Sequence, residues 1–255
     1  MKYCLLASGS RGNATWIQEG DQALLIDNGL SASNLLARAR SRGLIASQLR
    51  AIVVSHEHSD HVKGIGPLAR RERLTVWATQ ATIEASGPAL SGTRLQRFQA
   101  GEELDLGFLT IATIPTSHDA ADPLAFVVKN RDAQLGVITD LGVATHLVRD
   151  SLKNLSALVV EFNHDVGKLL DGPYPYFLKQ RVRSRLGHLS NEEGAELLSQ
   201  IYHPGLARVI LGHLSETNNT PELALAAAQS VLDRLGARPD LLVGDQHTPT
   251  AVFEL

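Results

Sequence analysis

The sequence has almost no cysteine. Cys4 is the only one among 255 residues, so the chain cannot close an internal disulfide or build a zinc site from several thiolates. Proteins without disulfides are typical of reducing compartments, and we therefore expect a cytoplasmic location.

Long hydrophobic runs are missing as well. No segment approaches the roughly 18 consecutive apolar residues of a membrane-spanning helix. The apolar stretch within Met1–Ser8 is too short for a secretory signal. We expect no membrane partner.

Aromatic residues make up only 5% of the chain, and the formal net charge is −3. Because aromatic rings are few, the chain offers little surface on which nucleic-acid bases could stack. The net charge argues against a protein that is basic all over, although bound divalent ions could create a local positive site. Tyr174, Tyr176 and Phe177 are clustered enough to stack against a terminal base, but core packing is the use we expect for them.

Hydrophobic residues are plentiful at 44%, and they form short apolar runs that alternate with helical patterns, which predicts an α/β protein. One domain over residues 1–255 is the expected organisation, and two fused halves are the alternative. Strands are expected at 3–7, 14–17, 23–26, 51–54, 74–78, 109–114, 125–128, 135–138, 157–162, 208–211, 241–243 and 251–253. Helices are expected at 31–42, 65–71, 80–86, 176–186, 191–202 (opened by a capping box of Ser190 and Glu193) and 220–236.

Four potential metal ligands follow the apolar run 51–54 within six residues, in the order His56, His58, Asp60 and His61. Alternate side chains of an extended segment share a face, so His56 and His58 can hold one ion, while Asp60 and His61 can hold a second. Imidazole and carboxylate ligands suit Zn, Mn or Fe. A histidine-rich surface turn or a structural zinc site is the alternative.

This run resembles the HxHxDH signature of the metallo-β-lactamase superfamily. The resemblance implies a four-layer αβ/βα sandwich, with two mixed β-sheets flanked by helices, and a dinuclear metal site. His118, Asp140 and His213 each follow a later β-branched run. Each residue alone is more typical of a hydrogen-bonded strand end, but together, in an order that resembles the superfamily's, they are the missing ligands we expect.

The resemblance also implies a role for each ligand. His56, His58 and His118 would hold one ion, Asp60, His61 and His213 would hold the other, and Asp140 would bridge them. Asp27, at the end of an earlier strand, would orient ligand histidines from behind. A turn aspartate is the alternative interpretation of Asp27.

Metal-assisted hydrolysis is the reaction class that these ligands indicate. Two divalent ions lower the pKa of a bridging water and stabilise charge on attacking and leaving oxygens. Asp60 could orient that nucleophile or accept its proton.

Later segments narrow the resemblance to the YycJ/WalJ-like branch of the superfamily; they are 6–15, 159–165, 174–191, 212–215 and 218–221. This branch implies a bacterial cytoplasmic, metal-dependent nuclease with 5′ exonuclease activity on DNA. The chain has no obvious separate RNA-binding arm, which argues against the processing of a large folded RNA. DNA is favoured over RNA as the substrate. The oligomeric state is left open.

Glu161 and His188 are candidate catalytic residues. His188 precedes the capping serine of a helix, where an anion is favoured, and Glu161 at a strand end could keep His188 protonated. The pair resembles the Glu and His of ribonuclease Z-like relatives and could serve as the general acid. Alternatively, His188 only caps the helix and Glu161 pairs with an arginine. His164 is a candidate for substrate contact.

Basic residues offer tentative phosphate contacts at Arg11, Lys179, Arg181 and Arg185, although a solvated helix surface would explain the last three equally well. The function we expect is a DNA 5′ exonuclease. The alternatives are a small-molecule hydrolase of the same fold, acting on a thioester, lactone or cyclic phosphodiester, and a non-catalytic DNA-binding regulatory protein.

Overall fold

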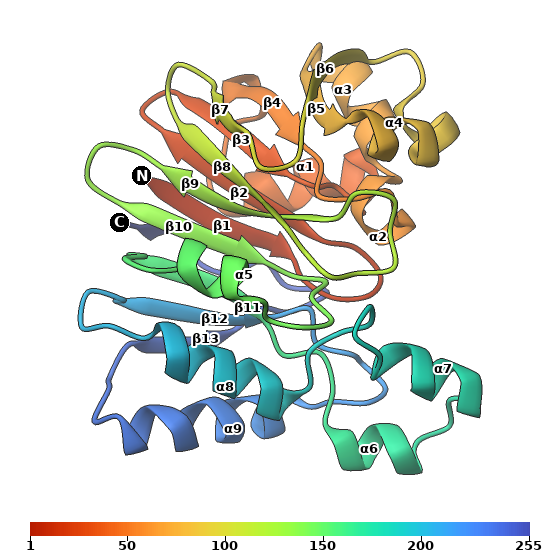
Figure 1. The fold of residues 1–255 in the computed structure, drawn as a ribbon. Helices are drawn as coiled ribbons and strands as arrows, with labels where there is room; N and C mark the ends of the chain where they lie inside the picture. The colour runs from red at the N-terminus through yellow and green to blue at the C-terminus, as the bar shows by residue number, and fades with distance from the viewer. The chain divides into compact units, whose positions relative to one another are not determined.

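The computed structural model describes residues 1–255 and contains two seven-stranded sheets (Figure 1). The first sheet has the strand order β14-β1-β2-β3-β4-β5-β6, and the second has the order β13-β12-β11-β10-β9-β8-β7. By the density of its contacts the chain divides into two compact units. Unit 1 comprises residues 1–113, 120–124 and 245–255, and unit 2 comprises residues 114–119 and 125–244.

Unit 1 holds the first sheet. Its strands are β1 (Lys2–Ala7), β2 (Ala14–Glu19), β3 (Gln22–Ile26), β4 (Leu49–Val53), β5 (Thr75–Thr79), β6 (Arg94–Phe98) and β14 (Phe253–Glu254). Strands β14, β1, β2 and β3 pair antiparallel, and β3, β4, β5 and β6 pair parallel. The sheet is therefore mixed, and its parallel half ends β3 and β4 at the same edge.

The other elements of unit 1 are α1 (Ala32–Ser41), α2 (Ser59–Val62), α3 (Ile65–Glu72), α4 (Gln80–Ser86), the 3-10 turns η1 (Ala46–Gln48) and η2 (Gly87–Leu90), and β7 (Glu103–Asp105), which pairs antiparallel with β8 (Thr110–Pro115). Helices α1 and α3 turn their apolar faces to the first sheet, where Leu35 and Leu68 join Trp16, Leu25 and Ile52 in one buried cluster. That burial packs β3 and β4 into the core of unit 1.

Unit 2 holds a run of parallel strands. Its strands are β9 (Leu124–Lys129), β10 (Gln134–Ile138), β11 (Ala157–Glu161), β12 (Arg208–Gly212) and β13 (Asp240–Val243). Strand β9 is antiparallel to β10, whereas β10 to β13 are parallel. The register sets Ile138 beside Val160 and Glu161 beside Gly212, so the carboxyl ends of β10, β11 and β12 lie level.

The helices of unit 2 are α5 (His146–Ser151), α6 (Val166–Asp171), α7 (Tyr176–Val182), α8 (Asn191–Ile201) and α9 (Pro221–Arg234). Figure 1 shows α8 and α9 side by side along β12 and β13, with α6 and α7 beyond the carboxyl ends of these strands. The predicted capping box of Ser190 and Glu193 is confirmed at the start of α8, and α9 begins at Pro221 after the capping hydroxyl of Thr220. No helix combines the length and the hydropathy that a bilayer crossing requires.

Two sequence predictions need correction. The helix expected at 176–186 ends at Val182, because the chain turns back and the amide of His188 donates to the Val182 carbonyl at 2.9 Å. Core packing was expected for the aromatic cluster, but Tyr176 is 77% exposed and Phe177 is 73% exposed. Helix α7 buries none of its residues.

Candidate functional site

The candidate ligands of unit 1 lie at the carboxyl ends of two neighbouring parallel strands. Asp27 follows β3, and its amide donates to the carbonyl of Val53, the last residue of β4. His56 comes after β4, and His61 lies in α2. Ser59–Val62 forms α2 and places Asp60 in its first turn. The chain therefore bends immediately after His58.

Asp27 holds this cluster in place through hydrogen bonds to Ser55 and His61. Its carboxylate accepts hydrogen bonds from the Ser55 amide at 2.8 Å, the Ser55 hydroxyl at 2.7 Å and Nδ1 of His61 at 2.8 Å. Asp27 is buried and has a φ of 58°, a left-handed conformation that a non-glycine residue adopts at some cost. The structure thus places Asp27 where it orients a histidine ring.

Asn13 is a neighbour that the sequence did not single out. It lies in the hairpin between β1 and β2, and its Nδ2 donates to Oδ2 of Asp60 at 3.2 Å and to Nε2 of His61 at 3.0 Å. Its backbone amide donates to the carbonyl of Asp60 at 2.8 Å. A lone asparagine in a hairpin gives no sequence signal for such a role, because the partners are about fifty residues away.

Unit 2 contributes three residues from consecutive parallel strands. Asp140 follows β10, Glu161 ends β11, and His213 follows β12. Asp140 has a φ of 57° and His213 has a φ of 54°. Left-handed backbone at buried, non-glycine residues persists only where the surroundings enforce it, and such residues gather at functional sites.

Glu161 is the hydrogen-bond acceptor that the other residues of this cluster share. Its Oε1 accepts hydrogen bonds from Nδ1 of His188 at 2.8 Å and from Nδ1 of His213 at 2.9 Å. The amides of Asp140, Leu141 and Leu189 donate to the same carboxylate. Glu161 is fully buried, whereas the side chain of His188 is 20% exposed. Only His188 of this pair can therefore meet a substrate, and Glu161 is a positioning residue.

The pair has shifted pKa values. Burial works to raise the pKa of Glu161, but the charge and hydrogen bonds of His188 and His213 outweigh burial and lower it to about 2. Burial works to lower the pKa of His188, but the Glu161 carboxylate outweighs it, and the pKa is raised. The structure therefore favours an ionised glutamate beside a protonated His188. The alternative in which Glu161 pairs with an arginine is wrong.

His118 follows β8 and is held by the loop after α7. Its Nδ1 donates to the carbonyl of Gly187 at 3.0 Å, and its Nε2 lies 3.7 Å from a carboxylate oxygen of Asp140. The rings of His118 and His188 are 5.0 Å apart between centroids. Burial lowers the pKa of His118, which favours the neutral ring that a metal ligand needs.

The histidines share one orientation that suits a divalent ion. Nδ1 of His56 lies 2.9 Å from the hydroxyl of Ser55; Nδ1 of His61, His118 and His213 is held by Asp27, the Gly187 carbonyl and Glu161, respectively. An oxygen acceptor at Nδ1 keeps the proton there and leaves the lone pair on Nε2, as in metal-ligating histidines. Within unit 2, ligand atoms of Asp140, Glu161, His188 and His213 all lie within 4.8 Å of one another.

The tentative substrate-contacting residues are placed differently from one another. His164 is 1% exposed, and burial lowers its pKa to about 4, so a neutral, buried ring has no surface to offer a substrate. Arg181 pairs with Asp119, and Nζ of Lys179 donates to the Leu170 carbonyl at 2.6 Å. Arg11 and Arg185 are exposed.

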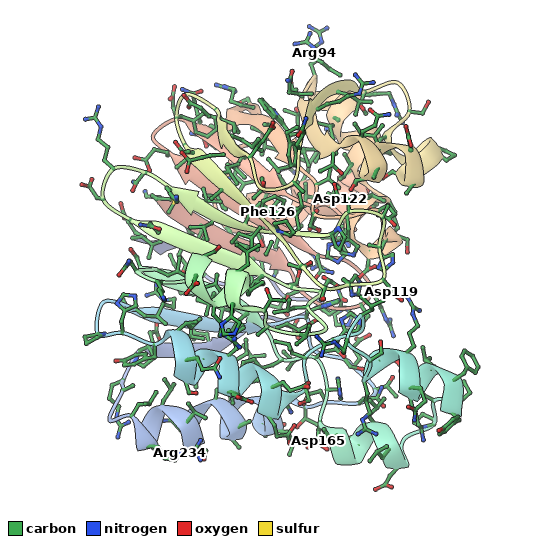
Figure 2. All side chains as sticks on the ribbon, viewed as in Figure 1. Arg94, Asp119, Asp122, Phe126, Asp165 and Arg234 are labelled. Carbon is green, nitrogen blue, oxygen red and sulfur yellow. The ribbon has the colours of Figure 1, made fainter.

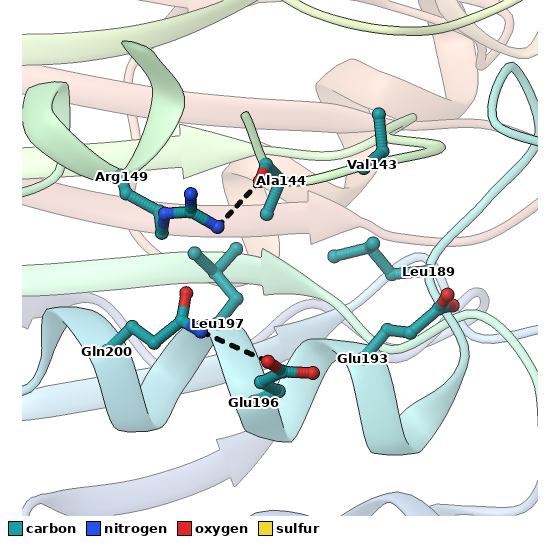
Figure 3. Close-up of a pocket in the computed structure, with 8 residues that line it drawn as sticks. All are labelled: Val143, Ala144, Arg149, Leu189, Glu193, Glu196, Leu197 and Gln200. Carbon is teal, nitrogen blue, oxygen red and sulfur yellow. Dashed lines mark hydrogen bonds between the residues drawn. The ribbon is translucent and has the colours of Figure 1, made fainter. Parts of the chain in front are cut away.

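A separate cavity of about 190 Å³ lies between α8 and the loop that leads to α5 (Figure 3). Its lining consists of Val143, Ala144, Arg149, Leu189, Glu193, Glu196, Leu197 and Gln200. Arg149 donates to the Ala144 carbonyl and Gln200 donates to Glu196 across its rim. None of the predicted ligands lines this cavity.

Comparison with known proteins supports one family. Residues 22–214 match the beta-lactamase superfamily domain. The chain is 34% identical to exodeoxyribonuclease YycJ of Bacillus anthracis, covering 92% of the chain and 90% of the relative, and 34% identical to exodeoxyribonuclease WalJ of Streptococcus pneumoniae, covering 98% and 96%. The metallo-beta-lactamase fold protein YhfI of Bacillus subtilis superposes with a TM-score of 0.73 at 20% identity, covering 98% of each chain. The predicted fold class is confirmed.

Proposed function

Because the chain belongs to the β-lactamase superfamily, in the branch of the YycJ and WalJ exodeoxyribonucleases, we propose that it is a metal-dependent exonuclease that digests DNA from the 5′ end. It is a hydrolase of phosphodiester bonds. The observation that carries the proposal is the cluster at the ends of β10, β11 and β12, where Glu161 holds both His188 and His213 beside Asp140. The expected cytoplasmic location is part of the proposal.

We assign two divalent ions, Zn, Mn or Fe, to the seven expected ligands on the strength of family membership. His56, His58 and His118 serve the first ion, Asp60, His61 and His213 serve the second, and Asp140 serves both. The anchored Nδ1 atoms support the assignment, because they keep the proton on Nδ1 and leave the basic lone pair on Nε2, the atom that would bind an ion. Imidazole and carboxylate donors without thiolate suit these metals.

Divalent ions held by these residues would supply an activated water at neutral pH and would neutralise charge on a phosphate. The residues of the chain do the rest. Asp60, restrained by Asn13, orients the attacking water, and Asp27 fixes the ring of His61. His188 carries the proton that the departing sugar oxygen needs, and Glu161 keeps that proton on it.

The test is hydrolysis by metal-loaded protein of 5′-phosphorylated DNA, 5′-hydroxyl DNA, a generic phosphodiester and a thioester. We expect turnover of DNA from the 5′ end, and loss of turnover in His58→Ala. His188→Gln should retain metal and lower kcat by about 10²-fold or more, the usual contribution of a general acid. Turnover of the thioester alone would favour the small-molecule hydrolase, and DNA binding without turnover would favour the regulatory protein.

A further inference from the structure

The segment 166–186 carries the most exposed aromatic side chains of the chain. Tyr176 and Phe177 begin α7 and are 77% and 73% exposed, and Leu170 at the end of α6 is 45% exposed. Nζ of Lys179 donates to the Leu170 carbonyl at 2.6 Å, which ties α7 to α6. Adjacent exposed apolar side chains of this kind are typical of a surface that binds a partner.

The charge of this segment is opposite to that of the chain. Residues 166–186 contain five cations, Lys168, Lys179, Arg181, Arg183 and Arg185, and one acid, Asp171. The whole chain has a net charge of −3. Arg181 is already paired with Asp119, and the guanidinium groups of Arg183 and Arg185 are exposed. The partner that this surface suits is therefore an anion that also presents flat apolar faces.

The segment is fixed to the candidate catalytic residues of unit 2. The amide of His188 donates to the Val182 carbonyl at 2.9 Å, and the amide of Asp119 donates to the Leu186 carbonyl at 3.0 Å. A Cβ at Gly187 would lie 2.1 Å from the Val182 carbonyl oxygen, so only glycine permits this close return of the chain. Figure 2 shows Asp119 beside α7 and Asp165 at the start of α6. Whatever binds α7 is therefore positioned relative to His118 and His188.

We propose that the α6–α7 surface, defined as residues 166–186, binds a single-stranded stretch of the DNA substrate, with Tyr176 and Phe177 stacking on bases and Arg183 and Arg185 contacting phosphates. The inference rests on the proposed function and names how that enzyme holds its substrate. Inside a duplex both faces of each base are covered by the neighbouring base pairs, so two rings can stack on successive bases only in a single strand, and stacking favours a single strand over a blunt duplex. The segment is hydrogen-bonded to the residues beside His118 and His188, and this favours the DNA substrate of these residues over an anionic membrane as the partner.

Binding is measured by fluorescence anisotropy on the full chain in EDTA, which prevents turnover, with a 3′-labelled, 5′-phosphorylated oligothymidylate. Stacking of one base on an aromatic ring corresponds to about 10-fold in Kd. We expect Tyr176→Ala and Phe177→Ala each to weaken binding by about this factor. Phe177→Trp should retain affinity, and Phe177→Leu should not, because it keeps an apolar group but loses the π-face. Arg183→Gln should reduce the dependence of binding on salt.

The matched control is Leu147→Ala, which removes another exposed apolar side chain (54% exposed) from α5 of the same unit. It should leave Kd unchanged. In metal-loaded protein, Phe177→Ala should raise KM for DNA while kcat for DNA and turnover of bis(p-nitrophenyl) phosphate stay as in the parent protein.

Normal DNA binding by Phe177→Ala would overturn the inference, as would equal affinity of Phe177→Leu and the parent protein. If the variants lose binding to vesicles of equal parts phosphatidylglycerol and phosphatidylcholine but still bind DNA, the inference is overturned in favour of a membrane surface. The proposed function fails separately, when metal-loaded parent protein does not hydrolyse DNA. If DNA is hydrolysed but the variants bind normally, only the α6–α7 assignment fails.

Discussion

At the scale of single residues, Glu161 is a buried carboxylate whose five hydrogen-bond donors come from three separate segments. A buried charge of this kind is tolerated because every donor satisfies it, and removing the charge leaves the donors without an equivalent acceptor. Removing the Glu161 charge should therefore lower the free energy of unfolding by a large amount for a single side chain.

We expect Glu161→Gln to lower the free energy of unfolding by about 3 kcal/mol at pH 7, since the pKa of Glu161 falls from the ordinary 4.5 to about 2 in the folded chain. The unfolded chain takes up the proton near pH 4.5, and the folded chain holds its charge down to about pH 2. The contribution of Glu161 is thus complete above pH 4.5 and disappears as the pH falls toward 2. Urea unfolding of metal-free protein across this range measures it.

The control for this variant is Glu196→Gln, which changes an exposed glutamate of α8 and should leave the unfolding curve nearly unchanged. Equal stability of Glu161→Gln and the parent protein at pH 7 would contradict the role given to the carboxylate.

At the scale of elements, α8 positions the residues that precede it. The Ser190 hydroxyl accepts a hydrogen bond from the backbone amide of Glu193, and the Glu193 carboxylate accepts one from the backbone amide of Ser190. Leu189, directly before the cap, donates its amide to Glu161. The cap therefore fixes the path of the chain at His188 as well as the first turn of the helix.

Ser190→Ala and Thr220→Ala remove the caps of α8 and α9 and should each lower the free energy of unfolding by about 1 kcal/mol. Only Ser190→Ala should also lower kcat, because only α8 starts next to His188. Chemical denaturation and steady-state kinetics on both variants give the comparison. Equal kcat losses in the two variants would mean that the α8 cap has no special link to His188.

At the scale of the whole molecule, the proposed ligands come from segments spread along the sequence from His56 to His213, so bound metal should stabilise the folded chain. A ligand at 100 times its Kd that binds only the folded state adds about 2.7 kcal/mol to the free energy of unfolding. Removing metal with EDTA should lower Tm, and adding Zn or Mn should restore it. Thermal unfolding followed by circular dichroism measures both.

Elemental analysis of the same samples should give two ions per chain, with fewer in His58→Ala and in His213→Ala. His146→Ala changes an exposed histidine on α5 and should keep the full complement. A full complement in both ligand variants would remove the basis of the seven-ligand assignment.

The prediction of a single domain over residues 1–255 stays a prediction.

Much of the fold follows from local patterns. The strand ends before Asp27, Asp140 and His213 were predicted to within two residues, because apolar runs and turn residues mark them locally. Strand β6 was not predicted, since Arg94–Phe98 is mostly exposed and polar at a sheet edge. Helices α5 and α6 were not predicted either, because six residues are too few to establish a 3.6-residue period.

The sequence by itself determined which donors are available, since residue type fixes ligand chemistry and apolar periodicity fixes where strands end. Only the tertiary structure decided which polar groups share a partner. Glu161 holds both His188 and His213, and Asn13 reaches Asp60 and His61. It also decided that Tyr176 and Phe177 stay in solvent. Burial and hydrogen bonding depend on segments far apart along the chain, and no local pattern records how those segments meet.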